Sequence, residues 1–256
     1  MRRVRLYLRL TRLAAVVALG LMLATGLRLR ALLGFMPSQG SRQQLCCWFL
    51  KRLAKSLPFE VRVTGDIPDQ PMLWVANHLS WSDIPLLGML QPMTFLAKAE
   101  IRQWPLIGWL TAEAGTQFIH RGHGDSATLS QQLAGELARG RSLLIFPEGT
   151  TTDGTLLRTF HSRLLACAID TGVAVQPVAI RYLRNGVTDP VAPFIGDDDL
   201  LSHLFRLLAE DAATVDIKLL PPLESQGAQR NPLARRCHDA IAVALYGDSI
   251  HVPVAA

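Results

Sequence analysis

The stretch that decides how this chain folds is Asn77-His78-Leu79-Ser80-Trp81-Ser82-Asp83. It directly follows an apolar run, Met72 to Ala76, whose length and composition are typical of a buried strand. Pro85, just beyond the stretch, suits the first turn of a helix that Ser82 or Asp83 would cap. The sequence therefore predicts a strand, a polar turn and a helix in succession, which is the repeating unit of α/β proteins.

The rest of the chain repeats this alternation. Short apolar runs with strand character lie at residues 59–63, 72–76, 94–97, 116–119, 142–146, 174–180 and 215–219. Amphipathic stretches with helical periodicity lie at residues 83–90, 105–114, 126–139, 159–171, 198–211 and 232–246. The acidic run at residues 197–199 is interpreted as helix-start charge rather than as a metal site. We expect an α/β fold with a mostly parallel central sheet flanked by helices.

His78 and Asp83 are the candidate catalytic pair. A carboxylate one turn away can hold one imidazole nitrogen protonated, which leaves the other nitrogen to take a proton from a hydroxyl. The alternative is a structural histidine bound to a nearby carboxylate, because His and Asp at this spacing often occur by chance. Ser80 lacks the Gly-x-Ser-x-Gly turn of serine hydrolases and is interpreted as structural. A lipid hydrolase in which His78 activates water is a further alternative.

Three more blocks follow in the sequence: Gly115 to Arg121 (GTQFIHR), Phe146 to Thr150 (FPEGT) and Val175 to Val178 (VQPV). With residues 77–83, and in this order, they resemble the blocks of the glycerolipid acyltransferase family, typified by lysophosphatidic acid acyltransferases. The resemblance covers about residues 60 to 185. It implies acyl transfer from a thioester, on acyl carrier protein or coenzyme A, to a lipid hydroxyl. It also implies that the His of the first block is the general base and that no covalent acyl-enzyme forms. Neither a cofactor nor a metal is expected.

The same resemblance suggests residues that bind substrate. Glu148 is either a carboxylate that binds the acceptor or a brace for its loop, and the family favours the first role. Gly149 permits close approach of the backbone, and Thr150 can donate to an oxyanion or a headgroup. Arg121 can bind the acceptor headgroup or the phosphates of the donor, with a surface salt bridge as the structural alternative.

The residues after this block, Thr151 to Gly154, depart from the family pattern. Many lysophosphatidate enzymes carry an arginine there, which faces the acceptor phosphate. A carboxylate in its place suits a zwitterionic acceptor better than a phosphate monoester. This run is similar to the branch that O-acylates lyso-ornithine lipid, which we take as the expected acceptor. The alternative is a 1-acyl-glycerol-3-phosphate acyltransferase that makes phosphatidic acid, with another arginine (Arg158, Arg163 or Arg181) at the phosphate.

The N-terminal quarter has a different character. Residues 1–64 contain twelve Lys or Arg and a single acid, whereas the remainder has a net charge of −6. Leu13 to Leu27 is uncharged and flanked by arginines, and as a helix it would be about 22 Å long. We expect a retained membrane helix there rather than a cleaved signal peptide. Residues 41–57 fit an amphipathic helix, either at the membrane interface or packed on the domain.

The apolar residues among these charges favour anionic lipid over nucleic acid as the partner. We therefore divide the chain into a membrane anchor with an interfacial helix, residues 1–58, and an acyltransferase domain, residues 59–256. The four cysteines show no zinc-like spacing and are expected to be reduced thiols. This places the catalytic domain on the cytoplasmic face of the inner membrane. A basic membrane-surface protein without catalytic activity is the alternative from another functional class.

Overall fold

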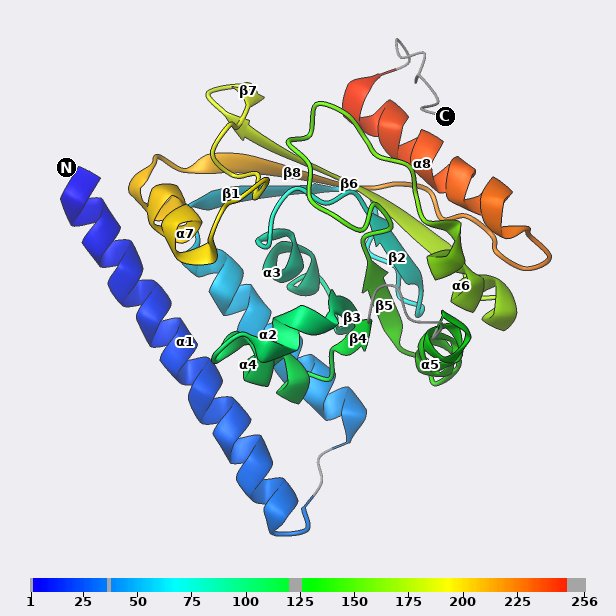
Figure 1. Ribbon diagram of the computed structural model, residues 1–256, viewed down its shortest axis with the longest axis horizontal. Coiled ribbons are helices and arrows are strands. Elements are labelled where there is room, and N and C mark those ends of the chain that lie inside the picture. The colour runs from blue at the N-terminus through cyan, green and yellow to red at the C-terminus, as the bar shows by residue number, and fades with distance from the viewer. Residues whose placement is uncertain (1, 36–37, 120–125, 248–256) are drawn as a thin grey trace.

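A computed structural model describes residues 2–35, 38–119 and 126–247 of the chain. Its strands are β1 (Phe59–Thr64), β2 (Leu73–Ala76), β3 (Met93–Lys98), β4 (Gln117–Ile119), β5 (Ser142–Ile145), β6 (Val175–Arg184), β7 (Val187–Thr188) and β8 (Ala213–Leu219). In the described residues they form one sheet in the order β1-β8-β6-β2-β5-β3-β4, with β7 paired to β6 (Figure 1). Strands β6, β2, β5, β3 and β4 run parallel, whereas β1 and β8 run the opposite way. The mostly parallel α/β fold is confirmed.

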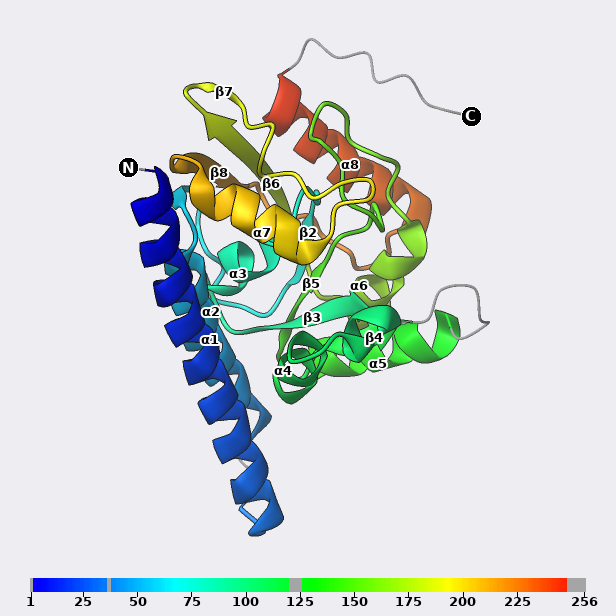
Figure 2. The same cartoon turned by 60° about the vertical axis from the view of Figure 1, so that its left-hand side comes forward.

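Helices cover both faces of the sheet, as Figures 1 and 2 show. The α-helices are α1 (Arg2–Leu32), α2 (Gln39–Ser56), α3 (Asp83–Gly88), α4 (Ile107–Glu113), α5 (Ser126–Ala138), α6 (Ala166–Thr171), α7 (Leu200–Ala209) and α8 (Arg230–Tyr246). Two 3₁₀ helices, η1 (Ala99–Gln103) and η2 (Ser162–Leu165), precede α4 and α6. The acidic run before α7 caps it, because the Asp199 carboxylate accepts from the backbone N–H groups of Leu201 and Ser202.

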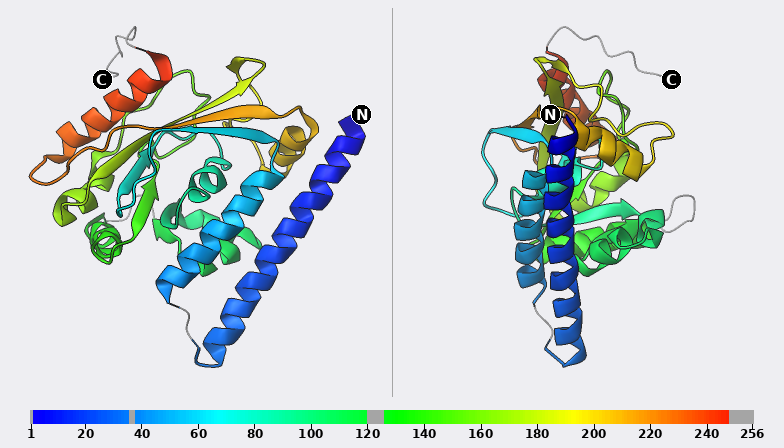
Figure 3. Two further views of the ribbon diagram at one scale, coloured as in Figure 1. Left: turned by 180° about the vertical axis from the view of Figure 1, so that it is seen from behind. Right: turned by 90° about the vertical axis from the view of Figure 1, so that its left-hand side faces the viewer.

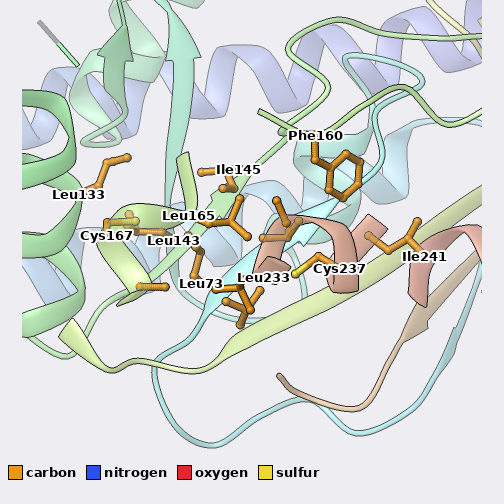
Figure 4. Packing of buried hydrophobic residues seen from close by; sticks show 14 of the residues in the cluster. Leu73, Leu133, Leu143, Ile145, Phe160, Leu165, Cys167, Leu233, Cys237 and Ile241 are labelled. Carbon is orange, nitrogen blue, oxygen red and sulfur yellow. The ribbon is translucent and has the colours of Figure 1, made fainter. Parts of the chain in front are cut away.

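Alternation along the strands divides the core into two clusters. Leu73 and Val75 of β2 point to one face, where they pack against side chains from α5, α6 and α8 (Figure 4). Trp74 and Ala76 point to the other face and meet residues of α2 and α3. Burial of β2 on both faces explains why its sequence is a continuous apolar run rather than an alternating one.

The site follows from this topology. Strands β2, β5 and β6 lie side by side and parallel, and β2 and β5 end together at one edge of the sheet, which β6 extends past. The segments that leave β2 and β5 at this edge are residues 77–83 and 146–150. Ligands of open α/β sheets bind at this edge.

The structure differs from the prediction at two places. The helix predicted at residues 159–171 begins only at Ser162, because Phe160 enters the core from a loop and the His161 N–H donates to the carbonyl of Pro147. The hairpin from β6 to β7 was not predicted. It turns at Asn185 and Gly186, both with positive φ.

The uncharged run Leu13 to Leu27 lies inside the longer helix α1, which is long and apolar enough to cross a membrane. Helices α1 and α2 lie side by side, and α1 also packs on α4 and α7 (Figure 3). Contacts with the domain occur near both ends of α1: Arg5 and Arg9 bind the carboxyl end of α7, and Arg28 approaches Glu113 of α4. In this structure α1 therefore lies along the domain rather than away from it.

Helix α2 packs on the domain, which is one of the two alternatives that the sequence left open. Leu50 and Ala54 are buried in the core cluster on its face of the sheet, so α2 is packed on the domain. On the outer side Trp48 is partly exposed, and the guanidinium of Arg52 lies 3.2 Å from the centroid of its ring.

Candidate active site

His78 and Asp83 lie in direct contact. The Nδ1 of His78 is 2.8 Å from Oδ2 of Asp83, and the Asp83 side chain is fully buried whereas that of His78 is 18% exposed. An ionised carboxylate only accepts, so Nδ1 carries the proton and Nε2 is the nitrogen left to accept one. This is the arrangement that a general base requires.

Backbone groups fix Asp83 in place. The N–H groups of Leu79 and Ser80 donate to the same Oδ2 atom at 2.8 and 3.0 Å. Asp83 also starts α3, and its own N–H donates to the carbonyl of Ser80. The turn between the two catalytic candidates is therefore closed by the carboxylate that orients the imidazole. Ser80 is itself fully buried, which supports its interpretation as structural.

Tyr182 of β6 completes the carboxylate site. Its hydroxyl donates to Oδ1 of Asp83 at 2.6 Å, and it lies 2.9 Å from the hydroxyl of Ser82. Burial and then the charge of Asp83 raise the pKa of Tyr182 well above its ordinary value, so the phenol stays protonated and donates. Tyr182 was not predicted from the sequence, because it is 99 residues from Asp83 in the chain.

The ring of Phe146 packs against one face of the His78 imidazole. The rings of His78 and Phe146 are stacked, with centroids 3.9 Å apart and planes inclined by 14°. Because Asp83 fixes one edge of the ring and Phe146 one face, the direction of Nε2 is set. Phe146 belongs to a block that the sequence analysis selected, but its contact with His78 was not predicted.

Glu148 binds two backbone segments. One carboxylate oxygen accepts from the N–H of His78 at 2.8 Å, and the other accepts from the N–H of Arg158 at 3.0 Å. Glu148 is only 4% exposed, and burial raises its pKa while these two hydrogen bonds oppose the rise. The sequence left two roles open for Glu148, binding of the acceptor or support of its own loop. These two contacts are the ones that support of the loop requires.

The next residues enclose the same turn. Gly149 has φ of +69°, and Thr150 is half-buried. The N–H of Thr152 donates to the carbonyl of His78 at 2.9 Å. Asp153 is exposed, and hydrogen bonds from Thr155 lower its pKa. A carboxylate thus stands in a loop bound to the His78 backbone. Arg121, the remaining predicted site residue, lies outside the described residues.

A histidine oriented by a carboxylate, at the carboxyl edge of a mostly parallel sheet, is the arrangement that removal of a proton from a hydroxyl would require. The acyltransferase family model matches residues 59–181, from the start of β1 into β6. The chain belongs to this family, and it is an acyltransferase.

The comparisons extend over most of the chain. It is 60% identical over 247 residues, 96% of each protein, to the lyso-ornithine lipid O-acyltransferase of Pseudomonas aeruginosa. It is 32% identical over 196 residues to the 1-acyl-sn-glycerol-3-phosphate acyltransferase of Neisseria gonorrhoeae, covering 75% of this chain and 76% of the relative. The crystal structure of the 1-acyl-sn-glycerophosphate acyltransferase PlsC of Thermotoga maritima has the same fold, with a TM-score of 0.70, 23% identity and 96% coverage of both chains.

Proposed function

We propose that this protein is a lyso-ornithine lipid O-acyltransferase, which moves a fatty acyl group from a thioester to the hydroxyl of lyso-ornithine lipid and produces ornithine lipid. The observation that carries the proposal is the 60% identity to the Pseudomonas aeruginosa enzyme of that name over nearly the whole of both chains. The pairing of His78 with Asp83 supplies the chemistry that such a reaction needs.

In this mechanism Nε2 of His78 takes the proton of the acceptor hydroxyl as its oxygen attacks the thioester carbonyl. The carbon–oxygen bond forms, the tetrahedral intermediate collapses and the carbon–sulfur bond breaks. The thiolate leaves with the electron pair and receives the proton that His78 took. Asp83 keeps Nδ1 protonated and stabilises the imidazolium while it exists.

The donor in this proposal is the thioester of acyl carrier protein or of coenzyme A. Gly149 and Thr150 follow Glu148 beside the His78 backbone, where they can line the substrate site, and Arg121 remains the predicted ligand of a headgroup or of donor phosphates. Since both oxygens of Glu148 accept backbone N–H groups, its contribution to substrate binding runs through the shape of the loop.

The acceptor proposal also uses the loop after Glu148. Asp153 is exposed there, in a loop whose Thr152 N–H is bound to the carbonyl of His78. A carboxylate attracts the ammonium group of a zwitterionic headgroup and repels a phosphate monoester. Of the three arginines that could serve a phosphate, Arg158, Arg163 and Arg181, the last approaches Asp216 at 3.6 Å.

We place the protein on the inner membrane with the domain on the cytoplasmic face. Helix α1 provides the apolar surface, and its contacts with α7 and α4 near both ends favour a helix that lies in the interface. All four cysteines are free thiols, as a reducing compartment requires.

A competition assay tests the acceptor. Purified protein receives one labelled acyl thioester and equal amounts of lyso-ornithine lipid and lysophosphatidate. We expect lyso-ornithine lipid to be acylated faster, and Asp153→Asn to reduce that preference several-fold. The matched control is Asp66→Asn, an exposed carboxylate after β1 at the opposite edge of the sheet. A wild-type preference for lysophosphatidate would establish the alternative acceptor and reject this one.

A further inference from the structure

His203 of α7 is a fully buried histidine that contacts the turn between His78 and Asp83. The indole N–H of Trp81, which lies between His78 and Asp83 in the sequence, donates to Nδ1 of His203 at 3.1 Å. The Nε2 of His203 lies 3.1 Å from the carbonyl oxygen of Pro193.

These two partners select one state of the ring. An indole N–H only donates and a carbonyl only accepts, so Nδ1 of His203 must be unprotonated and Nε2 must carry the proton. Burial, and next to it the charge of Arg206, lower the pKa of His203, which favours the same neutral form. A protonated ring would set two N–H groups against each other at Trp81.

The segment before α7 binds the same turn by a second route. The N–H of Phe194 donates to the carbonyl of Leu79 at 2.8 Å, and the hydroxyl of Thr151 donates to the carbonyl of Phe194. The rings of Phe194 and His203 meet edge to face at 5.3 Å. The turn is therefore held by side-chain contacts with α7 and by backbone contacts with the segment before it.

Helix α7 is itself anchored at both ends. Asp199 caps its first turn, as described above, and Arg206 pairs with Asp198. At the other end, Arg5 and Arg9 of α1 donate to the carbonyls of Ala209, Leu208 and Glu210. An anchored helix can fix the position of whatever its buried face binds.

We propose that His203 is a positioning residue for acyl transfer, which holds the turn between His78 and Asp83 through Trp81 so that Nε2 of His78 points at the acceptor hydroxyl. The proposal rests on the proposed function of His78 as general base. Asp83 fixes the tautomer and the orientation of the His78 imidazole, whereas His203 fixes the position of the turn to which His78 belongs.

Four variants test it: Trp81→Phe, His203→Phe, the double variant and His203→Gln. Both single phenylalanine variants should lower kcat roughly 10- to 100-fold, because small misplacements of a reacting group have effects of this size. The KM for each substrate should change less than about twofold, since binding is unaffected. The double variant should be no slower than the slower single variant. Glutamine can accept from Trp81 and donate to Pro193, so His203→Gln should recover most of kcat.

The control is His238→Phe on α8, a histidine whose ring meets that of Phe160 edge to face at 5.2 Å. Its kcat should equal that of the wild type. A folded His203→Phe protein with wild-type kcat, or one with an altered KM alone, would overturn the proposal. Equal losses in His203→Phe and His203→Gln would overturn it too. If His203→Phe is fully active while His78→Ala is inactive, only the positioning role fails; if His78→Ala is active, the proposed base fails instead.

Discussion

Replacement of Tyr182 by phenylalanine removes one hydroxyl from a fully buried site. The ring keeps its edge contact with Phe59, at 5.2 Å between centroids, so packing changes little. What is lost, together with the contact of 2.9 Å to the hydroxyl of Ser82, is the hydrogen bond of 2.6 Å to Oδ1 of Asp83. Among the described residues Tyr182 is the donor to that oxygen, whereas His78, Leu79 and Ser80 all bind Oδ2.

The size of the effect follows from these contacts. A hydrogen bond to a charged group contributes about 1.5–3 kcal/mol, and Asp83 is too buried for water to replace the hydroxyl. We expect the free energy of unfolding to fall by that amount. Because the three donors to Oδ2 still orient Asp83, kcat should fall only about tenfold, which corresponds to about 1.4 kcal/mol in the barrier.

Urea unfolding and initial rates of acyl transfer measure the two quantities. Tyr7→Phe is the control, since the Tyr7 side chain is exposed on α1. Should Tyr182→Phe unfold at the wild-type urea concentration and transfer acyl groups at the wild-type rate, the hydroxyl would contribute nothing to the Asp83 site. Such a result would show that the buried hydrogen bond stabilises neither the fold nor the catalytic geometry.

Two further predictions concern buried groups around the turn. Glu148→Gln places an NH₂ group against the N–H of His78 or of Arg158, so it should reduce the free energy of unfolding by about 1–3 kcal/mol and slow acyl transfer. Urea unfolding and initial rates measure the two effects. An unchanged unfolding midpoint would argue against Glu148 as the residue that holds this loop. Because the pKa of His203 is lowered from 6.5, the unfolded state binds more protons below that pH, so wild-type stability should fall relative to His203→Gln as the pH decreases from 6.5. Unfolding of both proteins at about pH 7.5 and about pH 5 tests the sign, and a constant difference would contradict it.

The parts of the fold that follow from local sequence were predictable. The apolar run of β2, the polar turn and the helix with Pro85 lie within about a dozen residues, and each has its own signal in composition or capping. Contact between His78 and Asp83 follows from them, because Asp83 begins α3 and its carboxylate reaches back over the turn to the N–H groups of Leu79 and Ser80 and to the imidazole of His78. The parallel sheet followed from repetition of the same unit.

Contacts in the site between residues that are far apart in the chain could not be predicted from local sequence. A strand pattern gives the face of the sheet on which Tyr182 or Phe146 lies, but it does not give strand order, which brings them to Asp83 and His78. His203 appeared in the sequence only as one position of an amphipathic helix. By contrast, the hairpin at Asn185 and Gly186 carried a signal in the sequence, since this pair favours the tight turn that joins β6 to β7.

The ends of α1 could not be predicted from the uncharged run alone. The uncharged run predicts the membrane segment, yet the helix continues through the arginines on both sides of it. Arginine is a good helix former, so nothing in the chain stops the helix there. Arg5 and Arg9 then find partners at the end of α7, and this depends on the tertiary structure alone.

We propose that His78 is the general base for acyl transfer to lyso-ornithine lipid. The direct measurement is the initial rate of labelled acyl transfer to that lipid by purified wild-type and His78→Ala proteins, compared after both show the same unfolding transition. We expect a fall of roughly 10²–10⁴-fold in His78→Ala, the range that general base catalysis supplies. A folded His78→Ala protein that transfers the acyl group at the wild-type rate would contradict it.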